Sequence, residues 1–410
     1  MSKVYPEFRT SMHRLTRWTP ELEVLIHSES RAAGFHLCGV ASAASNDESS
    51  DSDSERFAAW VEDGRAGEME YLKRRDTSGA YLRSTLQTAI PWAQSILVCA
   101  FNYNAAAPRS IDPAPRTTGW IGRYAWSGRS AEPGTADPGT GSSTPELIPT
   151  DYHNELLARL RQLETSLRAH ADCETRCYVD TGPILERAFA ARVGIGWIGK
   201  NTCVLNQQLG SWLLLGVIVT SLPAAELAEP HPAPPAGVSL APSADRCGTC
   251  TRCIDACPTD ALVAPRQMDA SRCIAYLTIE KKGSIPEDLR PAIGRQVFGC
   301  DICQDVCPWN RKAPIAVTAG MEPRLDLVNP ELAALAQLDS SGFKRRFKGS
   351  PLERTGRKRL QRNVAIAMGN SGEAQFLPQL EAWTKREDDL VLAEAARWAI
   401  DRIHAHENVP

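Results

Sequence analysis

The residues in this sequence with the clearest chemical potential are its cysteines. The chain has 13 of them. One run reads Cys247-x2-Cys250-x2-Cys253-x3-Cys257 and is followed by Pro258. Bacterial ferredoxins use this spacing to hold 4Fe–4S clusters, and the fourth cysteine of the run ligates the other cluster of the pair. Soft thiolate sulfur suits such iron sites, so the run predicts iron–sulfur chemistry.

A second set of cysteines completes the pattern. It consists of Cys273 and then Cys300-x2-Cys303-x3-Cys307, followed by proline. The crossover rule of two-cluster ferredoxins assigns all eight ligands. Cluster one takes Cys247, Cys250, Cys253 and Cys307, and cluster two takes Cys257, Cys273, Cys300 and Cys303.

Zinc ribbons are the alternative metal site for such cysteines. They are built on Cys-x2-Cys pairs and need neither the third cysteine of the first run nor the Cys-Pro ends, so the spacing favours iron–sulfur clusters. Five cysteines have no partner at ligand spacing, and we expect them to be small buried apolar residues. They are Cys38, Cys99, Cys173, Cys177 and Cys203.

A glycine-rich stretch, Gly194-Ile195-Gly196-Trp197-Ile198-Gly199, matches G-x-G-x-x-G and, with Lys200, nearly matches a phosphate-binding loop. A dinucleotide fingerprint needs a strand before it and an acidic residue about 20 positions later, and a phosphate-binding loop needs Ser or Thr after the lysine. Here a helical segment precedes the stretch and Asn201 follows the lysine. We therefore expect the glycines to let the loop approach some other large ligand.

The bulk composition limits what else the protein is. Its 410 residues predict two or three domains. A formal net charge of -3 gives no global basic field for nucleic acid. The N-terminus lacks the apolar segment of a signal peptide, and the longest apolar stretch, 212–219, is too short to span a membrane. These features predict a soluble cytoplasmic protein, in which clustered cysteines are metal ligands.

The elements that must position these groups are predicted from periodicity and composition. Strands are expected at 96–103, 177–180 and 212–222, and helices at 155–170 and 184–193. Polar segments at 42–55 and 127–150 predict a solvated loop and a disordered insertion, and 224–244 predicts a linker. The expected architecture is an α/β catalytic domain over 1–243, a bacterial-ferredoxin-like domain over 244–320 and an all-α domain over 321–410.

The C-terminal region shows helical spacing at 354–368 and 390–403, which suggests a HEAT-like helical pair. It also holds a basic segment, 344–362, in which nine cations accompany the single acid Glu353. Such charges would repel one another without a polyanion nearby.

Several stretches together resemble the epoxyqueuosine reductase family, from about Gly67 to the C-terminus. They are Val179-Asp180-Thr181-Gly182-Pro183, Glu186-Arg187-Ala188, Gly196-Trp197-Ile198-Gly199-Lys200-Asn201-Thr202, Arg272-Cys273-Ile274, Tyr276-Leu277-Thr278-Ile279-Glu280, Phe298-Gly299-Cys300-Asp301-Ile302-Cys303-Gln304, Pro308-Trp309-Asn310, Arg362-Asn363 and Met368-Gly369-Asn370. The segment 127–150 departs from the family, because it splits a stretch that usually reads continuously.

The resemblance implies an enzyme that reduces epoxyqueuosine to queuosine at the tRNA wobble position. Electrons would pass from an external low-potential donor through the two 4Fe–4S clusters to cobalamin, and Asp180 would be the proton donor. A general acid beside a departing oxygen contributes about 10²–10⁴-fold. Without the resemblance, Asp180 would be read as a turn or helix-cap residue.

The resemblance also implies the cofactor and tRNA contacts. Cobalamin would lie against Arg83, Tyr124, Asp180, Gly199, Lys200 and Asn201. The tRNA would contact Lys344, Arg345, Arg346, Arg357 and Lys358, and the enzyme would act as a monomer. The histidine motif that ligates cobalt in other proteins, D-x-H-x-x-G, is absent, so we expect His153 to be structural.

Two other functions use part of this framework. A reductive dehalogenase also pairs cobalamin with two clusters, but it usually carries an export signal. A ferredoxin-like electron-transfer protein without its own substrate would not need some 240 residues before its first ligand cysteine.

Overall fold

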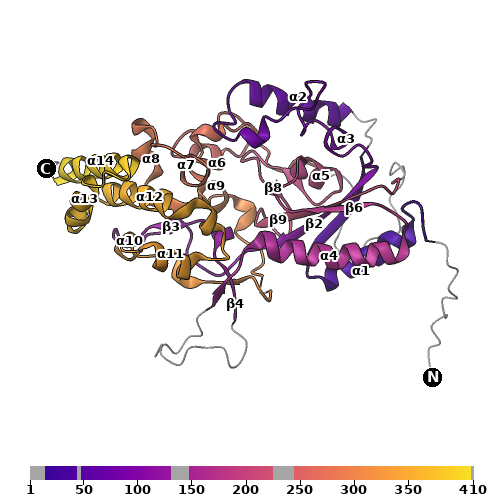
Figure 1. Cartoon of the computed structure of the whole chain (residues 1–410). Helices are drawn as coiled ribbons and strands as arrows, with labels where there is room; N and C mark the ends of the chain where they lie inside the picture. Colours follow the sequence, from indigo (N-terminus) through magenta and orange to yellow (C-terminus); the bar gives the residue numbers. More distant parts are fainter. Residues whose placement is uncertain (1–13, 44–47, 131–146, 225–243, 317, 408–410) are drawn as a thin grey trace.

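The computed structural model describes residues 14–43, 48–130, 147–224, 244–316 and 318–407 (Figure 1). A mixed α/β region comes first, a cysteine-rich region of short helices follows, and helices end the chain. Among the helices of the described residues, none is both long and apolar enough to cross a membrane.

A four-stranded antiparallel sheet forms the centre of the α/β region. Its order is β1 (Leu37–Ser42), β2 (Ser95–Asn102), β9 (Leu213–Thr220) and β6 (Thr175–Tyr178). Every residue of β2 is buried, because helices cover both faces of the sheet. The predicted strands at 96–103, 177–180 and 212–222 are confirmed within a few residues.

Helices α1 (Pro20–Ala32) and α4 (Tyr152–His170) lie side by side on one face of this sheet (Figure 1). The buried leucines of α4 recur at three- and four-residue spacing and pack on that face. Helix α5 (Glu186–Arg192) packs on the opposite face. The chain leaves β6 for α5 through residues 179–185, so this connection lies at one end of the sheet.

The cysteine-rich region consists of short elements. They are α6 (Arg252–Asp255), α7 (Ile274–Ile279), α8 (Arg290–Ile293), β10 (Gln296–Phe298) and α9 (Ile302–Asp305). Strand β10 pairs in parallel with β3 (Trp120–Ile121) of the α/β region. The two regions are therefore joined by backbone hydrogen bonds.

The C-terminal helices are α10 (Leu332–Ala336), α11 (Ser340–Phe347), α12 (Gly356–Ser371), α13 (Leu377–Thr384) and α14 (Leu390–Glu407). Helix α12 packs on α14, on α10 and on β10. One apolar core therefore runs through the helical region into the cysteine-rich region and across the expected boundary at residue 320. The HEAT-like character of these helices stays a prediction.

Two polar segments differ from expectation. Residues 48–62 form helix α2 (Glu48–Glu62) where a loop was predicted for 42–55, and Asp53 on this helix makes an ion pair with Arg192 of α5 at 3.1 Å. The ends of the expected insertion are paired strands, β4 (Ser127–Arg129) and β5 (Ile148–Pro149), and β11 (Glu322–Pro323) adds to them. Residues 131–146 and most of the expected linker, 225–243, lie outside the described residues.

Candidate active site

The eight cysteines of the two runs lie on short turns and helices that pack together. Helices α6 and α9, which carry Cys253 and Cys303, contact each other. Cys273 precedes α7 at its N-cap. Cys-Pro pairs end both runs, and Cys307 is buried while Cys257 is half-buried.

The thiols fall into two groups of electrostatic neighbours. In the first group, burial and the nearby Cys253 and Cys247 sulfurs together raise the pKa of Cys307 to about 11. Burial likewise raises the pKa of Cys253, with contributions from Cys247 and Cys250.

In the second group, burial and the neighbouring Cys273 and Cys257 raise the pKa of Cys300 well above its ordinary value. A hydrogen bond with Cys203, burial, and the charges of Cys300 and Cys273 do the same for Cys303. Cys307 therefore lies near the cysteines of the first run, and Cys257 lies near Cys273 and Cys300 of the second set.

No three His, Cys, Asp or Glu side chains of the described residues converge as the ligands of a single metal ion do. The two groups of four neighbouring thiols fit the ligand sets of two 4Fe–4S clusters.

Asp180 lies on the connection between β6 and α5, with a backbone φ of 59°. Aspartate tolerates this left-handed conformation better than most residues. The side chain is 68% exposed, and its carboxylate accepts a hydrogen bond from the Tyr152 hydroxyl at 2.7 Å. Burial raises the pKa of Tyr152 well above its ordinary value, so the hydroxyl remains a donor.

A polar network connects Asp180 to the C-terminal region. His153 Nε2 lies 4.0 Å from the Asp180 carboxylate, and His153 Nδ1 lies 2.9 Å from Asp151. The Arg354 guanidinium contacts both Asp151 and His153, at 3.0 Å and 3.3 Å respectively. The histidine expected to be structural therefore borders the acid, and an arginine of the basic segment contacts that histidine.

A cavity of about 300 Å³ borders the connection that carries Asp180, between α3 (Leu86–Ala89) and α5. Arg83 and Arg192 line it, and their Nε atoms are buried without a hydrogen-bond partner among the described residues. The Arg83 Nη1 donates to the carbonyl of Ile184 at 2.9 Å. The cavity therefore combines apolar walls with unused N–H groups.

The glycine stretch forms a tight hairpin of β7 (Trp197–Ile198) and β8 (Val204–Leu205). A Cβ on Gly196 would lie 2.1 Å from the Leu205 carbonyl oxygen, and one on Gly199 would lie 2.5 Å from the Leu205 side chain. These two glycines therefore let the hairpin close on itself, whereas we expected them to admit a ligand.

The two residues after Gly199 face the cysteine-rich region. Lys200 Nζ donates to the Gly248 carbonyl at 2.6 Å. Asn201 is buried, with its amide nitrogen 3.4 Å from the Cys303 carbonyl. Asp180 lies within electrostatic range of Tyr124, and both Asp180 and Arg83 lie within electrostatic range of Glu186. Cobalamin contact by Gly199, Lys200 and Asn201 stays a prediction.

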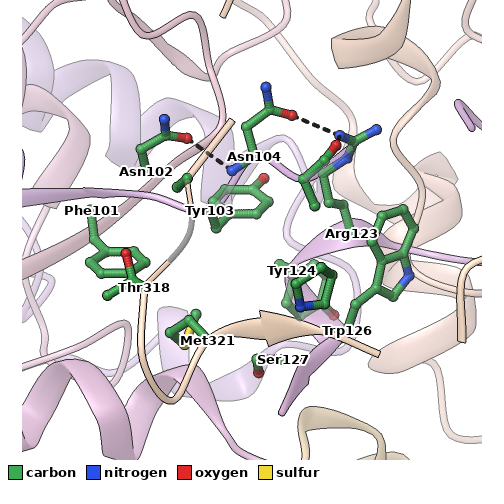
Figure 2. A pocket seen from close by; sticks show the side chains of 13 residues that line it. Phe101, Asn102, Tyr103, Asn104, Arg123, Tyr124, Trp126, Ser127, Thr318 and Met321 are labelled. Atoms are coloured by element: carbon green, nitrogen blue, oxygen red, sulfur yellow. Dashed lines mark hydrogen bonds between the residues drawn. The ribbon is translucent and has the colours of Figure 1, made fainter. Parts of the chain in front are cut away.

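Figure 2 shows a smaller cavity lined by the end of β2, by Arg123 and its neighbours, and by residues that follow the cysteine-rich region, such as Thr318 and Met321. Arg123 donates to the Asn104 side-chain oxygen at 2.7 Å, and the Asn104 backbone N–H donates to Asn102 at 2.9 Å. The Arg123 backbone N–H also donates to Asp301, between Cys300 and Cys303, at 2.6 Å. At about 20 Å³ the cavity has room for a water molecule and none for a substrate. It is part of the joint between the regions.

The basic segment 344–362 divides into inner and outer cations. Arg362 is buried and donates to the carbonyls of Leu277 and Lys281, and Arg359 donates to the carbonyl of Ile279 at 2.7 Å. Burial lowers the pKa of Arg362 to about 10. These inner arginines fasten α12 to α7, so they need no polyanion.

The five residues predicted to contact tRNA differ in their exposure and in the bonds that they already make within the protein. Lys344 and Arg345 are exposed on α11. Arg346 makes an ion pair with Asp326 at 3.3 Å. Arg357 is half-buried beside Gln361, and the 60% exposed Lys358 donates to the Asp388 carbonyl. The outer face is therefore basic chiefly at α11.

Sequence reasoning did not assign a role to Tyr152 or Trp197, and it placed Arg354 only in the basic segment predicted to contact tRNA. Tyr152 lies 28 residues from Asp180 in sequence, and its spacing gave no sign of contact with the acid. Trp197 lies in the glycine stretch, and its indole N–H lies 3.4 Å from the Cys247 sulfur. Both contacts depend on tertiary folding.

Comparison with known proteins adds independent information. Residues 246–310 match the family described as a 4Fe-4S double cluster binding domain, and residues 83–181 match the family described as epoxyqueuosine reductase QueG, DUF1730. Epoxyqueuosine reductase of Xanthomonas campestris is 35% identical over 92% of this chain and 94% of its own length. That of Burkholderia pseudomallei is 37% identical over 86% and 82%.

Solved structures are also similar to this chain. One is an epoxyqueuosine reductase with an epoxyqueuosine-modified stem loop of tyrosine tRNA, with a TM-score of 0.76 and 30% identity over 93% of this chain and 90% of that one. Another is the Bacillus subtilis enzyme with its aspartate-bearing catalytic loop swung out of the active site. It has a TM-score of 0.74 and 30% identity over the same shares of the two chains.

Proposed function

Because this chain belongs to the epoxyqueuosine reductase family, we propose that it reduces epoxyqueuosine to queuosine at the wobble position of tRNA. It is an oxidoreductase of that family. The observation that carries the proposal is the similarity to the tRNA-bound reductase over nine-tenths of both chains. Converting the epoxide to an alkene consumes two electrons and two protons and releases water, so the site needs an electron source and an acid.

The double-cluster domain accounts for the electron source. We propose that Cys247, Cys250, Cys253 and Cys307 hold cluster one, and that Cys257, Cys273, Cys300 and Cys303 hold cluster two. The grouping of thiols by their neighbours supports both sets. When bound, the clusters would supply single electrons taken from an external low-potential donor.

The cavity beside the Asp180 connection supports a site for part of cobalamin. Its unused arginine N–H groups fit a ligand rich in carbonyl and phosphate oxygens, and its apolar walls fit a large ring. We propose that Arg83, Tyr124 and Asp180 border the cofactor. When bound, cobalamin would supply a low-potential metal centre for the reducing chemistry, and the protein would bind and orient it.

Asp180 is the acid in this proposal, and it gives a proton to the departing epoxide oxygen. Its carboxyl is exposed toward a space that the cofactor and substrate would fill, and Tyr152 fixes the orientation of the carboxyl. The aspartate-bearing catalytic loop of the Bacillus subtilis relative supports this assignment. A positioned general acid contributes about 10²–10⁴-fold to the rate.

The basic outer face of the C-terminal region supports contact with the tRNA backbone. We propose that Lys344, Arg345, Arg346, Arg357 and Lys358 form this contact, with Lys344 and Arg345 the most exposed. Arg354 lies between this face and the Asp151–His153 pair. A tRNA bound on the segment would therefore place its modified base toward Asp180.

The experiment that tests the function is direct. The protein, with iron, sulfide and cobalamin reconstituted anaerobically, is incubated with an epoxyqueuosine-containing tyrosine tRNA stem loop and dithionite. Mass spectrometry of the digested nucleosides should show loss of one oxygen and the appearance of queuosine. Unchanged epoxyqueuosine, with both clusters present and reducible, would refute the proposal.

A further inference from the structure

The hairpin of β7 and β8 carries a tryptophan from the α/β region to the first cysteine run. The Trp197 indole N–H donates to the Cys247 sulfur, with 3.4 Å between nitrogen and sulfur. The ring is only 4% exposed and packs in one apolar cluster with Leu205 and Cys307. This N–H is therefore shielded from water and aimed at a ligand of cluster one.

Three further contacts hold the hairpin in this place. The backbone N–H of Arg266 donates to the Lys200 carbonyl, and the Arg266 Nε donates to the Ile198 carbonyl, both at 3.1 Å. Lys200 Nζ donates to the Gly248 carbonyl at 2.6 Å, next to Cys247. These contacts fix the backbone of the hairpin directly after Trp197, beside the first cysteine run.

Trp309 completes the enclosure from the second cysteine run. Its ring meets the Trp197 ring edge to face, with centroids 5.1 Å apart and planes at 77°. Trp309 follows Cys307-Pro308, so the cysteine that the crossover assigns to cluster one is buried beside the same ring pair.

We propose that Trp197 sets the reduction potential of cluster one through its hydrogen bond to the Cys247 sulfur. The proposal rests on the assignment of Cys247 to that cluster. Reduction adds one electron, and part of the added negative charge spreads onto the ligand sulfurs. An N–H donor stabilises the more negative, reduced state more than the oxidised state, which raises the potential. Shielding from water strengthens the effect.

The source of this donor has a functional consequence. Trp197 belongs to the α/β region, whereas the cluster ligands belong to the cysteine-rich region. The potential of cluster one therefore depends on a donor that lies outside the domain that ligates the cluster.

The test compares Trp197→Phe with Trp309→Phe in the full-length protein after anaerobic iron and sulfide reconstitution. Trp197→Phe removes the N–H and keeps an aromatic ring, whereas Trp309→Phe alters the packing partner and keeps the N–H donor. Both clusters are titrated with dithionite and mediators, and each is followed by EPR. Trp197→Phe should shift the reduction equilibrium of one cluster about tenfold toward the oxidised form, which is 59 mV for one electron. The reduction potential of the other cluster should not change.

An unchanged potential in Trp197→Phe with full iron content would overturn the proposal, and so would an equal shift in Trp309→Phe. If Trp197→Phe fails to retain iron, pulsed EPR of the Trp309→Phe protein with ¹⁵N-labelled indoles decides, because the proposal requires a ¹⁵N coupling to a reduced cluster. These measurements use neither tRNA nor turnover. A protein with the expected potentials that leaves epoxyqueuosine unchanged would refute the proposed function and leave this inference standing.

Discussion

The Tyr152 hydroxyl donates a hydrogen bond to the Asp180 carboxylate over 2.7 Å, and so joins the first turn of α4 to the connection between β6 and α5. The Tyr152 ring is fixed in turn, because it meets Tyr124 edge to face at 5.8 Å and lies 4.0 Å from the His153 ring. A rigid donor therefore orients an otherwise exposed carboxyl.

Removing this donor should slow the reaction without unfolding the protein. Tyr152→Phe keeps the buried ring and releases Asp180 into several orientations. We expect the single-turnover rate of deoxygenation to fall about tenfold, with cluster content and tRNA affinity unchanged. Tyr178→Phe is the matched control, because it removes a hydroxyl two residues from Asp180 that lies 3.4 Å from Arg176. Equal rates in wild type and Tyr152→Phe would show that the hydrogen bond does not position the acid.

Replacing the acid itself should have a larger effect. Asp180→Asn keeps the shape of the side chain and the Tyr152 contact but has no acidic proton to give. Turnover should fall about a hundredfold or more, while iron, cobalamin and tRNA binding persist. Asp172→Asn, an exposed change before β6, should be neutral. Loss of cobalamin or of folding in Asp180→Asn would make this residue an anchor or a structural cap.

The double-cluster domain and several main helices could be predicted from spacing because both are local patterns. Leucines at three- and four-residue intervals predicted α4, and the same periodicity predicted α12 and α14. Helix α2 was missed because its serines and acids resemble a solvated loop. Its Asp53 acquires a partner, Arg192, only in the folded chain.

The neighbours of the acid could not be predicted for a related reason. Tyr152, which contacts Asp180, lies 28 residues from it in sequence, and Arg354, which contacts His153 beside the acid, lies 174 residues from it. No spacing rule brings these residues together. The number of cations in the basic segment 344–362 also overstated how much positive charge faces outward. Arg362 and Arg359 bind backbone carbonyls of α7 and the turn after it, so only part of that charge faces outward.

The crossover of cluster ligands predicts which cysteine substitutions behave alike. Native protein should hold about eight irons, and loss of one cluster should leave about four. Cys307→Ala should abolish the same EPR signal as Cys250→Ala, and Cys257→Ala the same signal as Cys300→Ala. Cys177→Ala, outside both runs, should keep all the iron. The assignment fails if Cys307→Ala and Cys300→Ala remove one common signal.

The basic face of α11 predicts a salt-dependent tRNA affinity. Each phosphate contact contributes a slope of about 0.9 in the plot of log affinity against log salt. Reversing two exposed cations, Lys344→Glu with Arg345→Glu, should weaken binding of the stem loop and flatten this slope by about two. Lys385→Glu, at the end of α13, should leave both unchanged. An unaltered slope in the double variant would limit the segment to packing.

The burial of Glu186 should change the pH dependence of the unfolding free energy in the direction opposite to that of a surface acid. One carboxylate oxygen is buried without a partner among the described residues, and burial raises the pKa of Glu186 to about 7. At low pH Glu186 is protonated in both the folded and the unfolded state, so its burial as a carboxylate does not lower the free energy of unfolding. As the pH rises from its ordinary pKa toward 7, the unfolded chain ionises first, so the folded state loses relative stability. Glu186→Gln should therefore match wild type near pH 4 and exceed its unfolding free energy by up to about 3 kcal/mol at pH 8. Urea unfolding at both pH values checks this, and a constant difference would mean that the carboxylate is solvated.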